Sequence, residues 1–329
     1  MPNAIVCREL GPLEMLRLET IEAVALRPGE VRVALRAAGL NFPDVLMIEG
    51  RYQFKPELPF IPGMEAAGEV SEVAAGTDGV RVGDRVIVKM RHGCFAEEVV
   101  VARSQLAPLP DAFDYAEGAT FLAAHGTAYH ALVDRAQLKA GEVLLVHGAG
   151  GGVGLAAVEL GKVLGATVIA VASSAEKLAV ATSRGADHAL LSGSEPLRDA
   201  VKRLTGGRGA DVVFDPVGGA VFEDSLRCIA WGARLLVVGF TGGVGMAATN
   251  LVLIKGASVL GVRAGEAARR DPALAAARQA ALWRLANDGR LRPHISHRLP
   301  LADCPQAMRL LRERRAIGRV VLLMEPPSS

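Results

Sequence analysis

The arrangement of apolar and polar residues changes twice along the chain. Up to about Arg103, short runs rich in β-branched residues are separated by glycine or Pro-Gly turns: VRVALRAAG, AAGEVSEVAAG, DRVIVKM and CFAEEVVV. Short alternating runs with turn residues between them are typical of β-strands. The N-terminal region is therefore predicted to form a compact, mostly β domain.

From about Ala116 onward the pattern changes to buried strands that alternate with helices. Residues 117–133 carry small and apolar side chains at helical spacing. Strand-like apolar segments follow at 143–148, 167–174, 188–191, 210–218, 233–240 and 257–262. Helical spacing is found at 153–164, 176–184, 196–204 and 219–229. Six apolar strands that alternate with helices predict a doubly wound parallel sheet, the α/β fold that binds nucleotides.

The C-terminal tail has a third pattern. An Ala-rich helix over 272–288 ends at Gly289, and SHRLPLADC, the helical PQAMRLLRERR and the strand-like GRVVLLM follow. This tail is too short for a domain of its own, so we expect it to return to the N-terminal domain. The predicted organisation is a catalytic domain of residues 1–123 completed by 263–329, with a nucleotide-binding domain of residues 124–262 between them.

Length and composition narrow the class of protein. The chain has 329 residues, 50% hydrophobic and 22% charged, which favours two folded domains and excludes a disordered chain. A net charge of +2 does not indicate the strongly basic surface that nucleic-acid binding requires. No apolar run reaches the roughly 18 residues of a membrane span, and the N-terminus has no secretory signal pattern. The four cysteines form no CxxC pair. These features predict a soluble cytoplasmic protein without nucleic-acid or membrane partners.

The sharpest local signal is the glycine-rich run HGAGGGVG at 147–154, which follows a predicted strand and opens a predicted helix. Relative to the dinucleotide-binding pattern G-x-G-x-x-G, Ala149 replaces the first glycine, while Gly151 and Gly154 fill the other two positions. The helix N-terminus offers free N–H groups to a pyrophosphate. The candidate cofactor-binding residues are Gly150, Gly151, Gly152, Val153 and Gly154; a flexible loop in an unrelated α/β fold is the alternative.

The end of the next predicted strand indicates which dinucleotide binds. An NAD site usually places Asp or Glu there, whereas this strand ends in Ser173 and Ser174, with Lys177 one turn later. Two hydroxyls and an ammonium group suit the 2′-phosphate of NADPH, which a carboxylate would repel. Alternatively the serines only cap the following helix, and both roles are compatible. The prediction is an NADPH cofactor bound through Ser173, Ser174 and Lys177.

Seven segments resemble the zinc-free NADPH:quinone oxidoreductase branch of the medium-chain dehydrogenase/reductase superfamily, and they occur in the family's order. They are AAGLNFPDVLMIEGRYQ (37–53), PFIPGMEAAGEV (59–70), VGDRVIV (82–88), HGTAYHAL (125–132), HGAGGGVG (147–154), VVFDPVGG (212–219) and LLVVGFTGG (235–243). The resemblance implies an N-terminal GroES-like β domain, a Rossmann domain and a C-terminal return to the first domain.

The resemblance also implies that no metal is bound. Where zinc-dependent relatives carry ligands, this chain has Asn41, Met64 and Ala123, and only Glu65 of the usual ligands is left. One carboxylate cannot build the three-ligand site that catalytic zinc needs. Without a Lewis acid, alcohol dehydrogenation is disfavoured.

For the catalytic domain, the resemblance assigns roles to three residues. Asn41 and Asp44 are implied beside the nicotinamide ribose, and Tyr52 is implied to line the substrate cleft, where its hydroxyl is the candidate proton donor or substrate hydrogen bonder. Other interpretations are that Asn41 and Asp44 organise the turn around Pro43, and that Tyr52 covers the core.

For the nucleotide domain, the resemblance places Thr127 near the nicotinamide, with Phe240 and Thr241 bordering it from the end of a strand. Arg319 is implied to reach the cofactor phosphates. Phe240 could instead be an ordinary core residue. Some relatives have tyrosines where this chain has Leu46 and Ser192, and the loss of the first makes the cleft more apolar.

The predicted activity is transfer of hydride from NADPH to quinones or other activated α,β-unsaturated carbonyls such as enones. Positioning of the reactants supplies most of the catalysis in such a reaction. The alternatives are an enoyl or acryloyl thioester reductase of the same fold, and a non-catalytic, crystallin-like NADPH-binding protein. The resemblance further suggests a homodimer joined through residues 245–262, whose apolar NLVLIKGASVLGV is equally consistent with core.

Overall fold

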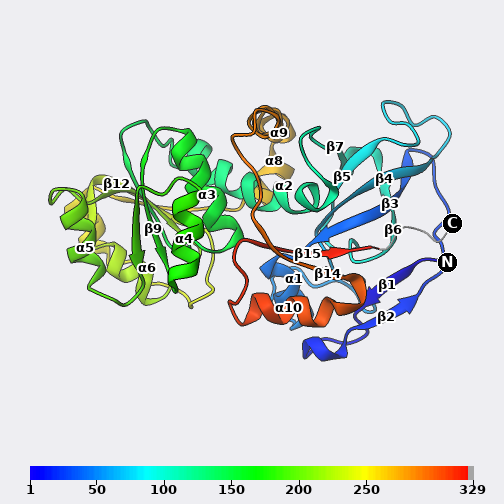
Figure 1. Ribbon diagram of the computed structural model, residues 1–329, viewed down its shortest axis with the longest axis horizontal. Coiled ribbons are helices and arrows are strands. Elements are labelled where there is room, and N and C mark those ends of the chain that lie inside the picture. The colour runs from blue at the N-terminus through cyan, green and yellow to red at the C-terminus, as the bar shows by residue number, and fades with distance from the viewer. Residues whose placement is uncertain (325–329) are drawn as a thin grey trace. The chain divides into compact units, whose positions relative to one another are not determined.

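The computed structural model describes residues 1–324, which divide into two units. The first comprises Met1–Ala123 together with the C-terminal segment that starts at Ile295 (Figure 1). The second comprises Ala124–His294, so that residues 263–294, predicted as part of the N-terminal domain, group with the second unit. Among residues 1–324, none of the helices combines the length and apolar character that a membrane crossing needs.

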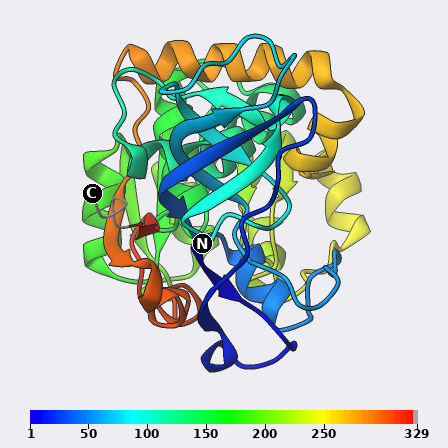
Figure 2. The same cartoon turned by 90° about the vertical axis from the view of Figure 1, so that its right-hand side faces the viewer.

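The first unit is built on antiparallel strands. Its elements are β1 (Asn3–Val6), β2 (Arg17–Thr20), β3 (Glu30–Gly39), α1 (Phe42–Ile48), β4 (Glu65–Val73), β5 (Arg85–Lys89), β6 (Glu98–Ala102), β7 (Leu106–Pro108), β14 (Ile295–Pro300), α10 (Cys304–Arg312) and β15 (Arg319–Leu323). The strand order of its main sheet is β14-β15-β3-β4-β5-β7, with β6 also paired to β3. Figure 2 faces this unit, with its N-terminal strands in blue and cyan.

The C-terminal strand returns to the N-terminal sheet, where β15 pairs antiparallel with β3 and places Val321 opposite Gly39. Alternate residues of β3 point into a core that includes Leu35, Phe95 and Met308, all at most 2% exposed. Burial of this apolar surface ties the two ends of the chain together. The predicted GroES-like unit is confirmed.

The second unit contains the predicted parallel sheet. Its elements are β8 (Val143–Val146), α3 (Gly152–Val163), β9 (Thr167–Ala172), α4 (Ala175–Ser183), β10 (His188–Leu191), α5 (Leu197–Leu204), β11 (Ala210–Asp215), α6 (Ala220–Ser225), β12 (Ile229–Val237), α7 (Thr249–Lys255), β13 (Ser258–Gly261), α8 (Ala264–Arg270) and α9 (Pro272–Asn287). All neighbouring strands are parallel, in the order β10-β9-β8-β11-β12-β13. The doubly wound six-stranded Rossmann sheet is confirmed.

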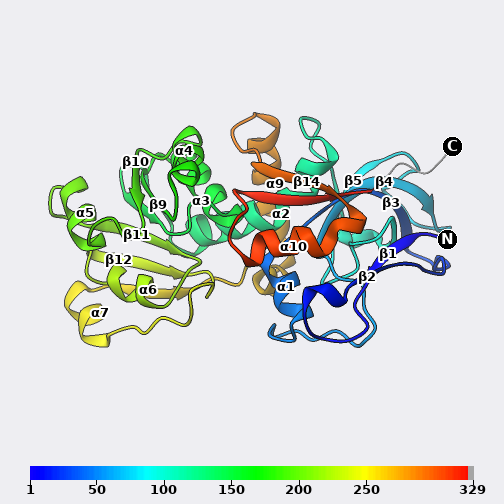
Figure 3. The same cartoon turned by 60° about the horizontal axis from the view of Figure 1, so that its bottom comes forward.

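Helices cover both faces of this sheet, as Figures 1 and 3 show. On one face, Gly161 of α3 lies so close to Leu144 and Val168 that a Cβ there would come within 2.5 Å of the Leu144 side chain. On the other face, Val201 of α5 and Phe222 of α6 pack with neighbouring strand residues such as Leu145. Burial on both faces explains why the strands are continuously apolar.

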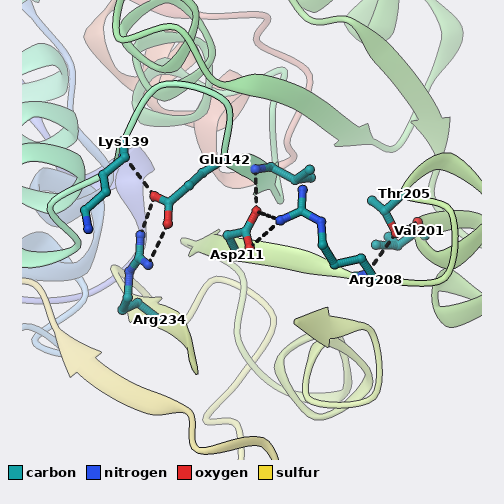
Figure 4. Close-up of polar contacts among 9 residues, drawn as sticks. Lys139, Glu142, Val201, Thr205, Arg208, Asp211 and Arg234 are labelled. Atoms are coloured by element: carbon teal, nitrogen blue, oxygen red, sulfur yellow. Dashed lines mark hydrogen bonds and ion pairs between the residues drawn. The ribbon is translucent and has the colours of Figure 1, made fainter. Parts of the chain in front are cut away.

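Polar contacts connect the amino ends of β8 and β11 and link Glu142, just before β8, to Arg234 within β12 (Figure 4). Arg234 of β12 donates to both oxygens of Glu142, at 2.9 and 2.6 Å. Asp211 of β11 accepts from the Val143 backbone N–H at 2.7 Å and is paired with Arg208. These contacts fix the strand register near the amino edge of the sheet. The glycine turn lies at the opposite, carboxyl edge.

Two of the helices that were not predicted from the sequence lie at residues 42–48 and 249–255. Residues 42–48, interpreted as a turn around Pro43, form α1, and proline is tolerated there because it lies in the first helical turn. The apolar segment that begins at Thr249 forms α7, a short helix that ends at Gly256 with a left-handed φ of 54°. The short length of both helices explains why periodicity alone did not reveal them.

Candidate functional site

The glycine turn lies between β8 and the N-terminus of α3. Gly148 has a left-handed φ of 56°, and its carbonyl accepts from the Gly151 N–H at 2.9 Å, which closes the turn. A Cβ on Gly154 would come within 2.2 Å of the Gly148 carbonyl oxygen, so only glycine permits this approach. Gly151 is exposed and Gly152 and Val153 are half-buried, so the first N–H groups of α3 are open to an anion.

Lys177 connects the glycine turn to the end of β9. Its ammonium group donates to the Ser173 hydroxyl at 3.2 Å, and its side-chain stem crosses Gly150, where a Cβ would come within 2.6 Å of it. Ser174 caps α4 by accepting from the Lys177 N–H at 3.4 Å, as the capping interpretation predicts. Glu176 is exposed, and its hydrogen bond with Ser174 lowers the pKa of its carboxyl. The structure thus brings together the predicted residues Gly150–Gly154, Ser173, Ser174 and Lys177.

The loops after β11 and β12 carry two more predicted residues. Phe240 is 58% exposed, which argues against a core role, and the Thr241 hydroxyl donates to the Pro216 carbonyl at 3.1 Å. Phe240 lines a pocket of about 90 Å³ together with Asp215 and apolar side chains. This volume is below the roughly 300–1,000 Å³ of typical ligand sites, so the pocket could hold only part of a ligand.

A buried polar cluster in the first unit contains Asn41, Asp44 and Arg319 together with Glu65. Arg319 forms an ion pair with Glu65 and donates to the Asn41 side-chain oxygen at 3.0 Å. The Asn41 amide nitrogen donates to Glu65 at 3.3 Å, and the second Glu65 oxygen accepts from the Ala123 N–H at 2.9 Å. Each of these four side chains is at most 8% exposed. The cluster therefore fixes the orientation of the Asn41 amide.

Asp44 lies in the first turn of α1 and completes this cluster. Its carboxylate accepts from the Asn41 N–H at 2.8 Å, as the turn interpretation predicts, whereas its other oxygen has no hydrogen-bond partner within the part of the chain that the structure describes. Burial raises the pKa of Asp44 to about 7, aided by the charge of Glu65, whereas Arg319 and the Asn41 N–H act in the opposite direction. Burial also raises the pKa of Glu65. Arg319 is paired with Glu65 and acts on Asp44 only through its charge, so burial is the dominant effect on the Asp44 carboxyl.

Tyr52, Thr127 and Arg319 are the remaining predicted residues, and Arg319 belongs to the polar cluster described above. Tyr52 is half-buried and packs against the core of the first unit, and its N–H donates to the Leu46 carbonyl at 3.1 Å. Thr127 is half-buried in α2 (Tyr115–Tyr129). Arg319 is engaged by Glu65 and Asn41 within its own unit, so its contact with cofactor phosphates stays a prediction.

Comparisons with known proteins agree with this geometry. Residues 27–111 match the family model of the alcohol dehydrogenase GroES-like domain, and residues 152–279 match that of the zinc-binding dehydrogenases. Over 99% of its length the chain is 36% identical to quinone oxidoreductase-like protein 2 of Rattus norvegicus, covering 97% of that protein. The chain belongs to the medium-chain dehydrogenase/reductase superfamily, in its quinone oxidoreductase-like branch.

Two solved structures of this superfamily extend the comparison. A mycobacterial protein complexed with NADPH is 30% identical, with a TM-score of 0.88 and coverage of 98% of this chain and 99% of that one. The CurK enoyl reductase is 26% identical, with a TM-score of 0.87 and coverage of 98% and 99%. The chain is thus a medium-chain oxidoreductase whose fold is shared by proteins of different names.

Although one matching family model is named for zinc binding, the residues of this quinone oxidoreductase-like protein do not fit a zinc site. Asn41, Met64 and Ala123 stand at the ligand positions, and both oxygens of Glu65 are engaged by Arg319, Asn41 and the Ala123 N–H. Within residues 1–324, no three His, Cys, Asp or Glu side chains gather as metal ligands. A catalytic zinc needs three such ligands.

Sequence reasoning left two structurally central residues out of the candidate site. Glu65 was noted only as the one remaining zinc-ligand position, yet its carboxylate connects Arg319, Asn41 and Ala123. The sequence feature that could have indicated its role is a carboxylate at the start of EAAG, a strand of small residues. Asp215 is 1% exposed and accepts from the N–H groups of Val217 and Gly218 at 2.7 and 2.9 Å. Asp215 therefore stabilises the turn after β11. The turn residues Pro-Val-Gly-Gly that follow it in the sequence could have indicated this role.

Proposed function

We propose that this oxidoreductase is an NADPH-dependent, metal-independent reductase that transfers hydride to quinones or other activated α,β-unsaturated carbonyls. The observation that carries the proposal is the contact of Lys177 with Ser173 beside an open glycine turn. The names of the rat relative and the NADPH-bound neighbour support the acceptor class and the cofactor.

The residues present fit the dinucleotide. The N–H groups of Gly152 and Val153 and the positive end of the α3 dipole would hold the pyrophosphate. Ser173, Ser174 and Lys177 would bind the 2′-phosphate, because hydroxyls and an ammonium group form charge-assisted hydrogen bonds with it. NADPH supplies the hydride from C4 of its nicotinamide. Thr127, Phe240 and Thr241 are proposed to border that ring.

In the first unit, Asn41 and Asp44 are proposed to face the nicotinamide ribose. The Asn41 amide is held by Arg319 and Glu65, so it would present a fixed orientation without further ordering cost. Tyr52 is proposed to bind the acceptor through its hydroxyl and to donate a proton. A quinone or enone is already electrophilic, so placing it against the hydride donor supplies most of the rate enhancement.

The second candidate is reduction of enoyl or acryloyl thioesters, which the likeness to CurK enoyl reductase favours. Both activities use the same hydride donor, and they differ in the acceptor that the first unit binds. Leu46, which makes the predicted cleft more apolar, is compatible with either.

We further propose a homodimer joined through residues 245–262. Support comes from β13, an edge strand of the six-stranded sheet, and from exposed apolar residues on the neighbouring α7: Leu253 is 80% and Ile254 62% exposed. Sedimentation velocity is expected to give a dimer for the wild type. Replacing Leu253 and Ile254 with glutamate should produce monomers, and a wild-type monomer at micromolar concentration would refute the proposal.

Steady-state assays with a purified sample test the proposed function. NADPH oxidation is expected with small quinones, with a kcat/KM at least about tenfold higher for NADPH than for NADH. Faster turnover of an acryloyl thioester than of any quinone would favour the second candidate. Tight NADPH binding without turnover of any acceptor would indicate a non-catalytic binding protein and refute both activities.

A further inference from the structure

A loop of the first unit carries aromatic and basic side chains next to the strand that supplies Glu65. The Met90 N–H donates to the Met64 carbonyl at 2.9 Å, and the Cys94 N–H donates to the Gly63 carbonyl at 3.1 Å. Gly63 has φ of 99°, and a Cβ there would come within 2.4 Å of the Phe95 ring. Residues 90–95 are therefore held firmly beside residues 60–64, which lead into the buried polar cluster.

His92 of this loop contacts two phenylalanine rings, one stacked and one edge-on. His92 is stacked on Phe54, with centroids 6.0 Å apart and an interplanar angle of 20°, and meets Phe60 edge-on at 5.9 Å. Phe54 packs against the same core as Tyr52, the predicted acceptor residue. Phe54 and His92 are half-buried, so an apolar ring surface is partly open to solvent two residues along the chain from Tyr52, the proposed acceptor residue.

Arg91 completes the group. Its guanidinium carbon lies 4.8 Å from the centroid of the Phe54 ring, a cation–π contact. Arg91 is exposed, and within residues 1–324 no carboxylate lies in ion-pair distance of it. By contrast, Arg51 at the start of the neighbouring loop is paired with Glu49 at 3.2 Å. Arg91 is thus a positioned positive charge that the protein itself does not neutralise.

We propose that Arg91, Phe54 and His92 form an anion-recognising subsite for the acceptor, so that the preferred acceptors carry a carboxylate, sulfonate or phosphate beside an apolar body. This inference rests on the proposed function, because it concerns the same acceptor. The ring stack supplies the apolar surface, and the guanidinium supplies directional donors for the anionic group. A neutral acceptor uses only the rings and therefore binds more weakly.

The test compares a naphthoquinone sulfonate with the parent naphthoquinone in the wild type and in Arg91→Gln. The variant is expected to raise the KM for the sulfonate about fivefold and to leave the KM for the neutral quinone within about twofold, because an exposed charge pair contributes about 1 kcal/mol. The sulfonate preference of the wild type should also shrink as salt is added. Arg27→Gln, an exposed residue in the turn before β3, is the control and should change neither KM.

A second variant separates charge from stacking. Phe54→Leu keeps an apolar side chain but removes the aromatic ring that would stack on the quinone. It should therefore raise the KM for both quinones. Equal KM changes for the two quinones in Arg91→Gln, or none, would overturn the subsite while leaving the reductase activity intact.

If neither quinone is reduced, the proposed function fails, and calorimetric binding of naphthalene sulfonate still tests the subsite. In that case the expected result is binding that Arg91→Gln weakens. No binding, or the same Kd in both proteins, would overturn the inference.

Discussion

Replacing Lys177 with glutamate is expected to weaken NADPH binding about a hundredfold. The ammonium group that contacts Ser173 would be lost, and a carboxylate would face the 2′-phosphate instead. Loss of one hydrogen bond to a charged group costs about 1.5–3 kcal/mol, and repulsion adds to that cost. NADH lacks the phosphate, so its affinity should change by less than about threefold. Fluorescence titration of the purified variant with both dinucleotides measures the two Kd values.

The comparison within one variant provides its own control, because misfolding would weaken both dinucleotides alike. A milder variant, Lys177→Gln, should fall between the wild type and Lys177→Glu for NADPH. Equal losses for NADPH and NADH, with an unchanged melting temperature, would show that the 2′-phosphate binds elsewhere.

The sequence predicted the second unit well because its central strands β8, β9 and β11 are buried on both faces. Val143–Val146 is continuously apolar, Ala210–Asp215 carries the apolar run Val212–Phe214, and helices of regular spacing separate the strands. The predicted ends of the helices and strands were less accurate: β12 begins at Ile229 rather than 233, and α6 ends at Ser225 rather than 229. The boundary depends on strand pairing, because Ala210 pairs with Ile229 across an irregular register that no local pattern encodes.

The candidate site was predictable where it is local in sequence. The glycine turn follows β8, and Lys177 lies in the first turn of α4 just after β9, so spacing and residue type suffice to find them. The Arg319–Glu65 ion pair joins residues 254 positions apart, and it exists because β15 pairs with β3 beside β4. Such a contact depends on tertiary topology, which explains why Arg319 was assigned only to phosphates.

Replacing Arg319 with methionine is expected to lower the free energy of unfolding by about 3–5 kcal/mol. Methionine has a similar volume but leaves the buried Glu65 without its positive partner and Asn41 without a donor. Arg298→Met is the matched control, because Arg298 is paired with Asp114 at the surface, with side chains 46% and 51% exposed. The control should cost less than about 1 kcal/mol. Urea denaturation of both variants gives the two values.

The loss in Arg319→Met should also depend on pH. Asp44, with a pKa raised to about 7, and Glu65, whose pKa is also raised, bind protons more tightly in the folded than in the unfolded state. The stability associated with a raised carboxyl pKa is present at low pH and is lost as pH rises through the folded pKa. Without Arg319 both pKa values should rise further, so the destabilisation should be smaller at about pH 5.5 than at about pH 8.

Adding Glu65→Gln to the Arg319→Met variant should recover at least about half of the lost free energy of unfolding, since the unpaired charge is then removed. A loss independent of pH that Glu65→Gln does not recover would show that Arg319 stabilises the fold by packing rather than by charge.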